Sequence, residues 1–146
     1  MGYVYSVALS PDGQLIVSGS GDNLVKVWSV SGGKEVASLA GHTEDVLSVA
    51  FSPDGQHIVS GSGDNLVKVW SVSARKEVAS LAGHTNSVCS VAFSPDGQHI
   101  VSGSEDKSVK VWFVSARKEV ASLAGHASVV RSVAFSPDGQ YIVYGS

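Results

Sequence analysis

The chain has 146 residues but only one cysteine, Cys89, which excludes an intrachain disulfide and a thiolate metal site and fits a reducing compartment. Charged residues make up only 16% of the chain, and the formal net charge is −3. Lys and Arg are mostly scattered singly, which argues against nucleic acid as a partner. No run approaches the roughly 18 apolar residues of a membrane helix, and no signal peptide is visible. We therefore expect no membrane partner and a cytoplasmic location.

What the chain does contain is an internal repeat. Its three tryptophans, Trp28, Trp70 and Trp112, stand 42 residues apart, and the sequence around them repeats with the same period. The second and third units differ at only seven of 42 positions, and such near-identity indicates recent amplification or an engineered sequence. The expected divisions are 1–42, 43–84 and 85–126 for three full units, and 127–146 for part of a fourth.

Each full unit is predicted to form four short strands. In the second unit we expect them at Val46–Phe51, His57–Ser62, Val67–Val72 and Glu77–Leu81. Ser-Pro-Asp-Gly separates the first two; its Pro fixes φ, and its Gly permits the positive φ of a tight turn. Val-Lys-Val-Trp in the third alternates as a strand with one buried face does. Because no segment has a sustained helical period, the fold is predicted to be all-β, and four strands per unit are typical of propeller blades.

These motifs resemble the repeats of the WD40 family. Gly-His, Ser-Pro-Asp-Gly, Ser-Gly-Ser followed by Asp, and Val-Lys-Val-Trp recur in register over essentially the whole chain. The Trp-Asp pair that names the family is absent, because Ser or Phe follows each Trp: Trp28-Ser29, Trp70-Ser71 and Trp112-Phe113. The resemblance implies one domain over residues 1–146, a propeller fragment of three four-stranded blades plus a two-stranded half-blade.

The resemblance also implies a buried hydrogen-bond chain of His, Ser, Asp and Trp in a blade. Matched by position, two sets are complete: His42, Ser60, Asp64 and Trp70, and His84, Ser102, Asp106 and Trp112. A structural role is expected, because a buried polar group without a partner costs about 1–3 kcal/mol. The same residue types form hydrolase triads, but the set recurs in each full unit and no nucleophile elbow surrounds the Ser. We therefore assign no catalytic residue, no metal ligand and no cofactor site.

All four tyrosines, Tyr3, Tyr5, Tyr141 and Tyr144, lie where the repeat is incomplete. Tyrosine is enriched at protein interfaces, so we expect these residues to line a seam between chains; drift of the terminal sequence is the alternative. An open row of blades also exposes an apolar sheet face at each end. Because the units are nearly identical, the faces of two chains should fit head to tail.

The expected partner is therefore a second copy, in a head-to-tail homodimer or a higher even oligomer that completes the ring. A symmetric ring of two chains has eight positions, namely six full blades and two half-blades. A closed monomer with fewer blades is the structural alternative.

Variation among the units is concentrated at the start of the first strand and in the loop before it. In the WD40 family this region surrounds the channel mouth, where partners often dock, although drift at solvent-facing positions would give the same variation. The candidate partner-binding residues are Glu44, Asp45, Leu47, Asn86, Ser87, Cys89 and Arg131. We expect a non-enzymatic scaffold that self-assembles and presents a rigid protein-binding surface. The alternative is an engineered or recently amplified repeat protein whose only activity is self-assembly.

Overall fold

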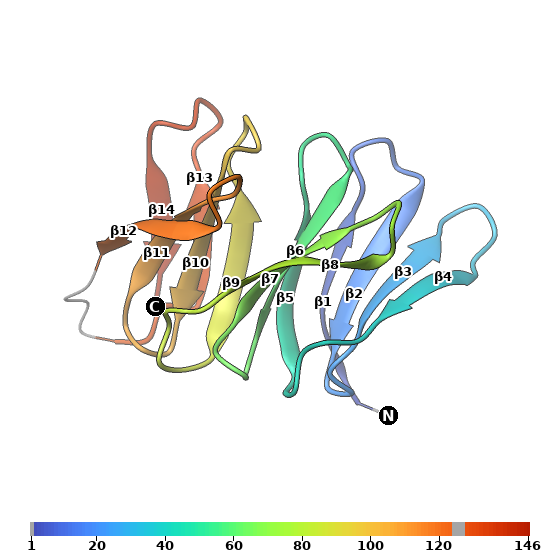
Figure 1. The fold of residues 1–146 in the computed structure, drawn as a ribbon, viewed down its shortest axis with the longest axis horizontal. Coiled ribbons are helices and arrows are strands. Elements are labelled where there is room, and N and C mark those ends of the chain that lie inside the picture. Colours follow the sequence, from blue (N-terminus) through green and yellow to red (C-terminus); the bar gives the residue numbers. More distant parts are fainter. Residues whose placement is uncertain (1, 124–127) are drawn as a thin grey trace.

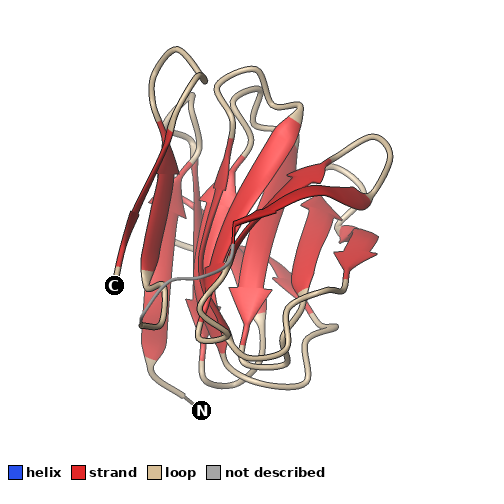
Figure 2. Cartoon of the chain, turned by 90° about the vertical axis from the view of Figure 1, so that its left-hand side faces the viewer, coloured by secondary structure: helices blue, strands red, loops and turns tan. Residues whose placement is uncertain are grey.

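The structure is a computed structural model that describes residues 2–123 and 128–146, so the expected boundary between residues 126 and 127 lies outside the described residues. Within these ranges every regular element is a strand, and no helix is long and apolar enough to cross a membrane (Figure 2). The strands are β1 (Val4–Leu9), β2 (Leu15–Ser20), β3 (Val25–Ser29), β4 (Glu35–Leu39), β5 (Val46–Phe51), β6 (His57–Ser62), β7 (Val67–Ser71), β8 (Lys76–Leu81), β9 (Val88–Phe93), β10 (His99–Ser104), β11 (Val109–Phe113), β12 (Lys118–Leu123), β13 (Ser132–Phe135) and β14 (Ile142–Gly145).

The strands form three four-stranded sheets and one two-stranded sheet, each antiparallel and ordered as in the chain. This arrangement confirms the predicted all-β propeller fragment. The sheets stand face to face in a row, with β1–β4 at one end and β13–β14 at the other (Figure 1). The row is open, so the closed monomer is not the arrangement of the described chain.

The predicted strands of the second unit agree closely with the structure. β5 and β6 have the predicted bounds, whereas β7 ends at Ser71 instead of Val72 and β8 begins at Lys76 instead of Glu77. The difference arises because Ser71 and Lys76 form the last pair of the β7–β8 ladder. Beyond that pair, the N–H of Val72 donates instead to the carbonyl of Gln56, at 3.0 Å.

The Ser-Pro-Asp-Gly turn between β5 and β6 is closed by its own side chains. One carboxylate oxygen of Asp54 accepts hydrogen bonds from the Ser52 hydroxyl at 2.6 Å and from the Gln56 N–H at 2.9 Å. Gly55 has a φ of 73°, a left-handed conformation that favours glycine. The repeated motif therefore specifies a repeated hairpin.

The hydrophobic core lies between the sheets, and we call the contact between two neighbouring sheets a seam. We call the face of a sheet that is turned toward the next sheet in the chain its trailing face, and the face turned toward the preceding sheet its leading face. In each seam the trailing face of one sheet packs against the leading face of the next. The first seam joins Val17, Val25, Val27 and Leu39 of the first sheet to Val46, Val49, Ile58 and Trp70 of the second. Equivalent side chains form the second seam, and a smaller set forms the third.

A valine and a glycine set the close approach of the sheets in every seam. A Cβ atom added at Gly61 would lie 2.7 Å from Cγ1 of Val88 in the next sheet, closer than two carbon atoms can approach. The corresponding distance is 2.6 Å from Gly19 to Val46 and 2.7 Å from Gly103 to Val130. Glycine is therefore required in the second strand of each sheet so that the following valine can enter.

A hydrogen bond also crosses each seam at the innermost strands. The serine hydroxyl of one sheet accepts the backbone N–H of a valine in the next, 43 residues further along the chain. These bonds join Ser6 to Val49 at 3.1 Å, Ser48 to Val91 at 3.2 Å and Ser90 to Val133 at 3.2 Å. Each seam thus carries the same polar and apolar contacts.

Candidate functional site

The second sheet contains a continuous hydrogen-bond chain from the loop before β5 to its third strand. His42 Nδ1 lies 2.8 Å from Asp64 Oδ2, and His42 Nε2 lies 2.7 Å from Ser60 Oγ. The indole N–H of Trp70 donates to the same Ser60 oxygen at 2.8 Å. An ionised carboxylate only accepts, so Nδ1 carries the histidine proton, and the Ser60 hydroxyl donates to Nε2.

The third sheet repeats this arrangement. His84 bridges Asp106 at 2.8 Å and Ser102 at 2.7 Å, and Trp112 donates to Ser102 at 2.8 Å. One bond is added, because the hydroxyl of Ser108 donates to Asp106 at 2.6 Å. Ser108 occupies the position of Leu66, so this extra donor comes from one of the few differences between the units.

Burial sets the protonation of these groups. Loss of hydration lowers the pKa of His42 and of His84, despite the neighbouring carboxylates. Burial by itself would raise the pKa of Asp106, but hydrogen bonds from Ser108, His84 and the Thr85 N–H outweigh it and lower that pKa to about 2. Burial would also raise the pKa of Asp64, but its hydrogen bonds with His42 and with the N–H groups of Thr43 and Leu66 outweigh this effect and lower the pKa. In each set, therefore, the histidine is neutral and lies between an ionised carboxylate and a hydroxyl.

The geometry of these sets does not suit nucleophilic catalysis. Ser60 and Ser102 are fully buried, so no substrate can reach their hydroxyls. Each hydroxyl oxygen also accepts an indole N–H, which engages one of its two lone pairs and holds the oxygen against the tryptophan. The sets instead satisfy buried polar groups and connect the start of the sheet to its third strand.

The first sheet has a shorter version of this chain. Trp28 donates to Ser18 at 3.0 Å, and Asp22 accepts hydrogen bonds from the Ser20 hydroxyl and the Leu24 N–H. Trp28 is only partly buried, whereas Trp70 and Trp112 are 1% exposed. In the fourth unit Tyr144 stands at the serine position, and His126 lies outside the described residues.

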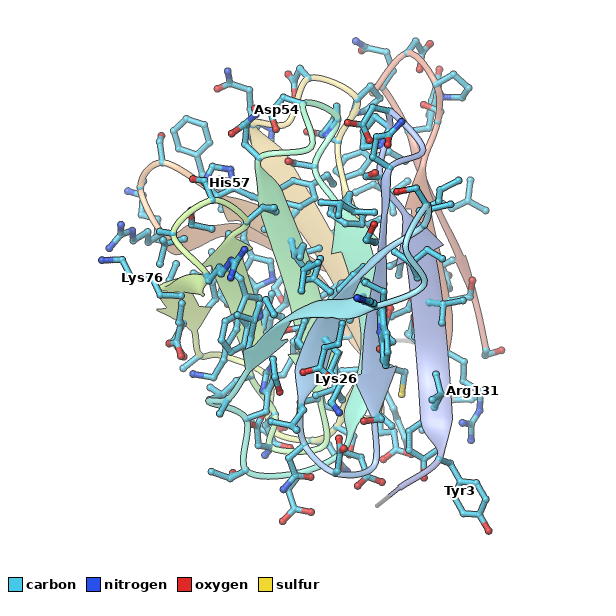
Figure 3. All side chains as sticks on the ribbon, turned by 90° about the vertical axis from the view of Figure 1, so that its right-hand side faces the viewer. Tyr3, Lys26, Asp54, His57, Lys76 and Arg131 are labelled. Atoms are coloured by element: carbon cyan, nitrogen blue, oxygen red, sulfur yellow. The ribbon has the colours of Figure 1, made fainter. Side chains whose placement is uncertain are left out.

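The four tyrosines lie at the two ends of the row and are exposed. Tyr3 and Arg131 lie in the lower part of Figure 3, and Asp54 and His57 lie in the upper part. Tyr5 interacts with Asp45 of the neighbouring sheet, whose negative charge raises the pKa of the Tyr5 phenol. Tyr5 therefore makes a contact within the chain, at the mouth of the first seam.

The candidate partner-binding residues gather at the same end of the sheets, beside the turns between the second and third strands. Glu44, Asn86 and Arg131 are exposed, whereas Asp45, Leu47, Ser87 and Cys89 are half-buried. Burial raises the pKa of the Cys89 thiol, and the charge of Glu105 adds to this rise. Cys89 is thus held as a thiol and does not offer a reactive thiolate.

The structure contains two apolar hollows whose lining residues were not predicted, although an exposed apolar face at each end of the row was expected. One is a hollow of about 450 Å³ on the leading face of the first sheet, lined by Val4, Val7, Ile16, Trp28 and Val30 among others. Their equivalents in other units are core residues, so nothing in a comparison of repeats marks them as exposed. The second is a groove of about 420 Å³ along the hairpin turns, lined by Leu9, Phe51, Phe93, Phe135 and the adjoining prolines. The recurring Ala-Phe-Ser-Pro sequence is its signal.

Comparison with known proteins identifies the family. The chain belongs to the WD40 family, described as WD domain, G-beta repeat, which matches residues 1–29, 33–71, 75–112 and 117–146. The chain is similar to a probable serine/threonine-protein kinase, PkwA, of Thermomonospora curvata, with 51% identity over 39 residues, which is 27% of this chain and 5% of that protein. It is also similar to the general transcriptional corepressor TUP1 of Saccharomyces cerevisiae, with 39% identity over 44 residues, 30% of this chain and 6% of that protein. The matches thus span only a small part of both relatives.

Proposed function

We propose that this chain is a non-enzymatic scaffold, whose copies assemble head to tail into a closed propeller that presents a rigid protein-binding face. Residues 1–42, 43–84 and 85–126 would be its blades, and 127–146 the half-blade. The observation that carries the proposal is that the two end faces of the row hold the unmatched halves of one further seam.

The first unmatched pair is the valine and the glycine. Val4 corresponds to the valines that enter the glycine positions of the internal seams, yet it is 63% exposed. Gly145 corresponds to Gly19, Gly61 and Gly103, but a Cβ added there would meet no described atom within 4 Å. Val4 of one copy has the shape to enter beside Gly145 of another.

The second unmatched pair is polar. Ser132 corresponds to Ser6, Ser48 and Ser90, whose hydroxyls accept a valine N–H across a seam. Val7 corresponds to the valines that donate, and among the described residues neither Ser132 nor the Val7 N–H has such a bond. Placing the leading face of one copy on the trailing face of another would join them.

At the edge of the new seam, an arginine of one copy would lie beside a tyrosine of the other. Within the chain, Tyr5 meets Asp45 across the first seam. The equivalent pair between copies is Arg131 and Tyr3, which are both exposed. An arginine beside a tyrosine ring is a favourable cation–π pair, worth about 0.5–1 kcal/mol at an exposed site.

Light scattering tests the assembly directly. Two copies in a ring of eight positions should have twice the 15.1 kDa mass of one chain. Gly145→Val should fill the site that Val4 enters, and Val7→Asp should place a charge in the seam, so each variant alone should be monomeric. Circular dichroism of each variant verifies that the monomer is folded.

Mixing the two variants provides a matched control. Gly145→Val leaves one leading face intact, and Val7→Asp leaves one trailing face intact, so a head-to-tail contact allows one good seam between them. The mixture should therefore recover a heterodimer. A stable monomer of the unmodified chain at micromolar concentration would contradict the assembly.

A protein-binding role for the ring is supported by the family and by the varied, exposed positions around Glu44, Asn86 and Arg131. An affinity purification with the unmodified chain and with a double alanine variant of Glu44 and Asn86, which lie outside the proposed seam between copies, tests it. A protein captured by the former and lost from the latter supports the scaffold. Recovery of the chain alone favours the alternative, in which an engineered or recently amplified repeat protein only assembles.

A further inference from the structure

A groove and a pocket meet at the end of the sheets that carries the Ser-Pro-Asp-Gly turns. The groove, of about 420 Å³, runs along these turns, and Phe51 and Phe93 are part of its apolar lining. The pocket, of about 300 Å³, lies between the turn of the second sheet and that of the third, and it shares Ser52, Pro53 and Phe93 with the groove. The described residues that line this pocket all belong to the second and third units, so it is internal to the row.

The two turns are held against each other, so the pocket is preformed. A Cβ atom added at Gly97 would lie 3.6 Å from Cδ of Pro53, an ordinary van der Waals distance, so the third turn rests directly on the second. The hydrogen bond from the Val91 N–H to the Ser48 hydroxyl joins the same two sheets. A preformed pocket loses little conformational entropy when a ligand enters it.

Asp54 and Asp96 place two negative charges in the lining of the pocket. Each uses Oδ1 to close its own turn; that of Asp96 accepts from the Ser94 hydroxyl at 2.6 Å and from the Gln98 N–H at 2.9 Å. The serine and glutamine hydrogen bonds lower the pKa of both carboxyl groups, so both are ionised at neutral pH. Within the described part of the chain no Lys or Arg forms an ion pair with either carboxylate, and Oδ2 of each can accept hydrogen bonds from a ligand.

Aromatic rings form another part of the pocket lining, since Phe93 and His57 both contribute to it. In the third unit the ring centroid of His99 lies 5.2 Å from that of Phe113, the residue paired with it on the neighbouring strand. Ser71 is the residue paired with His57 in the second unit, so the His57 ring has no such neighbour. The pocket therefore combines flat rings with two carboxylates, beside an apolar groove.

We propose that the groove and the pocket together form a docking site for an extended peptide of the pattern Leu-x-Arg-x-Leu in a partner protein. Alternate side chains of an extended peptide face the same side, so the arginine enters the pocket while the two leucines lie in the groove, on Phe51 and Phe93. The guanidinium donates to Asp54 and Asp96 and lies against the rings. Arginine fits better than lysine, because its planar group can bond two carboxylates and stack at the same time. The same carboxylates repel phosphate groups, so a lipid surface or a nucleic acid does not suit the site.

This site is separate from the surfaces proposed for assembly and for partner binding. The pocket includes none of Val4, Val7, Ser132 and Gly145, on which the proposed seam between copies depends. The candidate partner-binding residues lie at the opposite end of the strands, as the places of Arg131 and Asp54 in Figure 3 show. Peptide docking therefore does not depend on whether two copies associate.

A fluorescein-labelled synthetic peptide, Gly-Leu-Ser-Arg-Ser-Leu-Gly with an amidated C-terminus, provides the probe. Fluorescence anisotropy with the intact chain should show saturable binding. Replacing the arginine of the peptide by glutamine should weaken binding by about tenfold, because it removes the charge-assisted hydrogen bonds. Replacing both leucines by serine should also weaken binding, because the groove then receives no apolar side chain.

Matched variants of the chain test the two carboxylates. Asp54→Asn and Asp96→Asn should each weaken binding by about fivefold, because an amide keeps the oxygen that closes the turn but carries no charge. Asp12→Asn makes the same change in the turn of the first sheet, where the Asp12 carboxylate accepts from Ser10 and Gln14 in the same way, outside the pocket. This control should change the affinity less than about twofold, and circular dichroism verifies that all three variants are folded.

Three results would overturn the proposal: no saturable binding at about 1 mM chain, equal affinity for the glutamine peptide, or equal weakening by Asp12→Asn and Asp54→Asn. The last result would mean that the peptide is attracted only by the overall negative charge. The peptide is also tested against the chain carrying Val7→Asp, which removes the proposed assembly seam. Binding that persists there supports a site within one chain, even if light scattering finds no oligomer, whereas its loss would show that the site needs a second copy and would overturn the proposal.

Discussion

Replacing Trp70 by Ala should destabilise the protein more than replacing Trp28, although the two residues occupy the same position in their units. Trp70 is 1% exposed and packs in the first seam with Leu39, Val46 and Ile58. Burying about 200 Å² of aromatic surface at about 25 cal/mol per Å² corresponds to roughly 5 kcal/mol. Measured losses for such truncations are about 3–5 kcal/mol, so we expect about 4 kcal/mol for Trp70→Ala.

Replacing Trp28 should cost less stability, because its side chain makes fewer contacts. No sheet covers its leading face, which opens into the hollow beside Val4, and Lys26 lies 6.0 Å from its ring centroid. Its hydrogen bond to Ser18 is not extended by a histidine. Because Trp28 is only partly buried, Trp28→Ala should cost less, about 3 kcal/mol.

Denaturant unfolding followed by circular dichroism measures both losses, because that signal does not depend on tryptophan. The measurement belongs at a concentration where light scattering finds monomers, since Trp28 lies on the face proposed to bind a second copy. Trp112→Ala is the matched control and should behave like Trp70→Ala. Equal losses for Trp28 and Trp70 would refute the reasoning that neighbouring sheets, and not the local sequence, determine the stabilisation.

Three further outcomes are expected. Gly61→Ala should destabilise the protein by about 1–3 kcal/mol in thermal unfolding, because the added Cβ meets Val88, whereas Gly145→Ala should change the monomer little. Lys107→Asn should stabilise it by about 0.5–1 kcal/mol in the same assay, because Lys107 has a φ of 69° and Asn65 adopts this conformation in the unit before. The free energy of unfolding, measured in denaturant between about pH 2 and 8, should fall below about pH 6.5: burial depresses the histidine pKa values, so the unfolded chain takes up protons first. His84→Asn should reduce that fall, and a second loss should appear between pH 3.8 and about 2 as Asp106 is protonated.

Much of the architecture followed from the period, because each unit carries its own turns and strand pattern. The Asp54 carboxylate closes a local hairpin, and β5 and β6 begin and end where their residue patterns predicted. The bounds of β7 and β8 differed by one residue because the ladder pair of Ser71 and Lys76 depends on how two strands meet, which local pattern does not specify.

An apolar face at each end of the row was expected, but the residues that form it were not predicted from the sequence. Tyrosines attracted attention because they differ from the repeat, but the apolar leading face consists mainly of Val4, Val7 and Trp28, which match it. The contact of Tyr5 with Asp45 joins residues of two sheets and needs the packing of the sheets to become visible. Differences among repeats indicate where sequence has changed, not where a neighbour is absent.

The contrast between Val4 and Val46 shows why the binding properties proposed for this chain need no specialised residues. Both begin the first strand of their unit, yet Val46 is completely buried and Val4 is 63% exposed. The difference in burial arises from the preceding sheet, whose Gly19 receives Val46. The contacts that stabilise an internal seam are therefore available, unchanged, for a partner that presents the same glycine and serine.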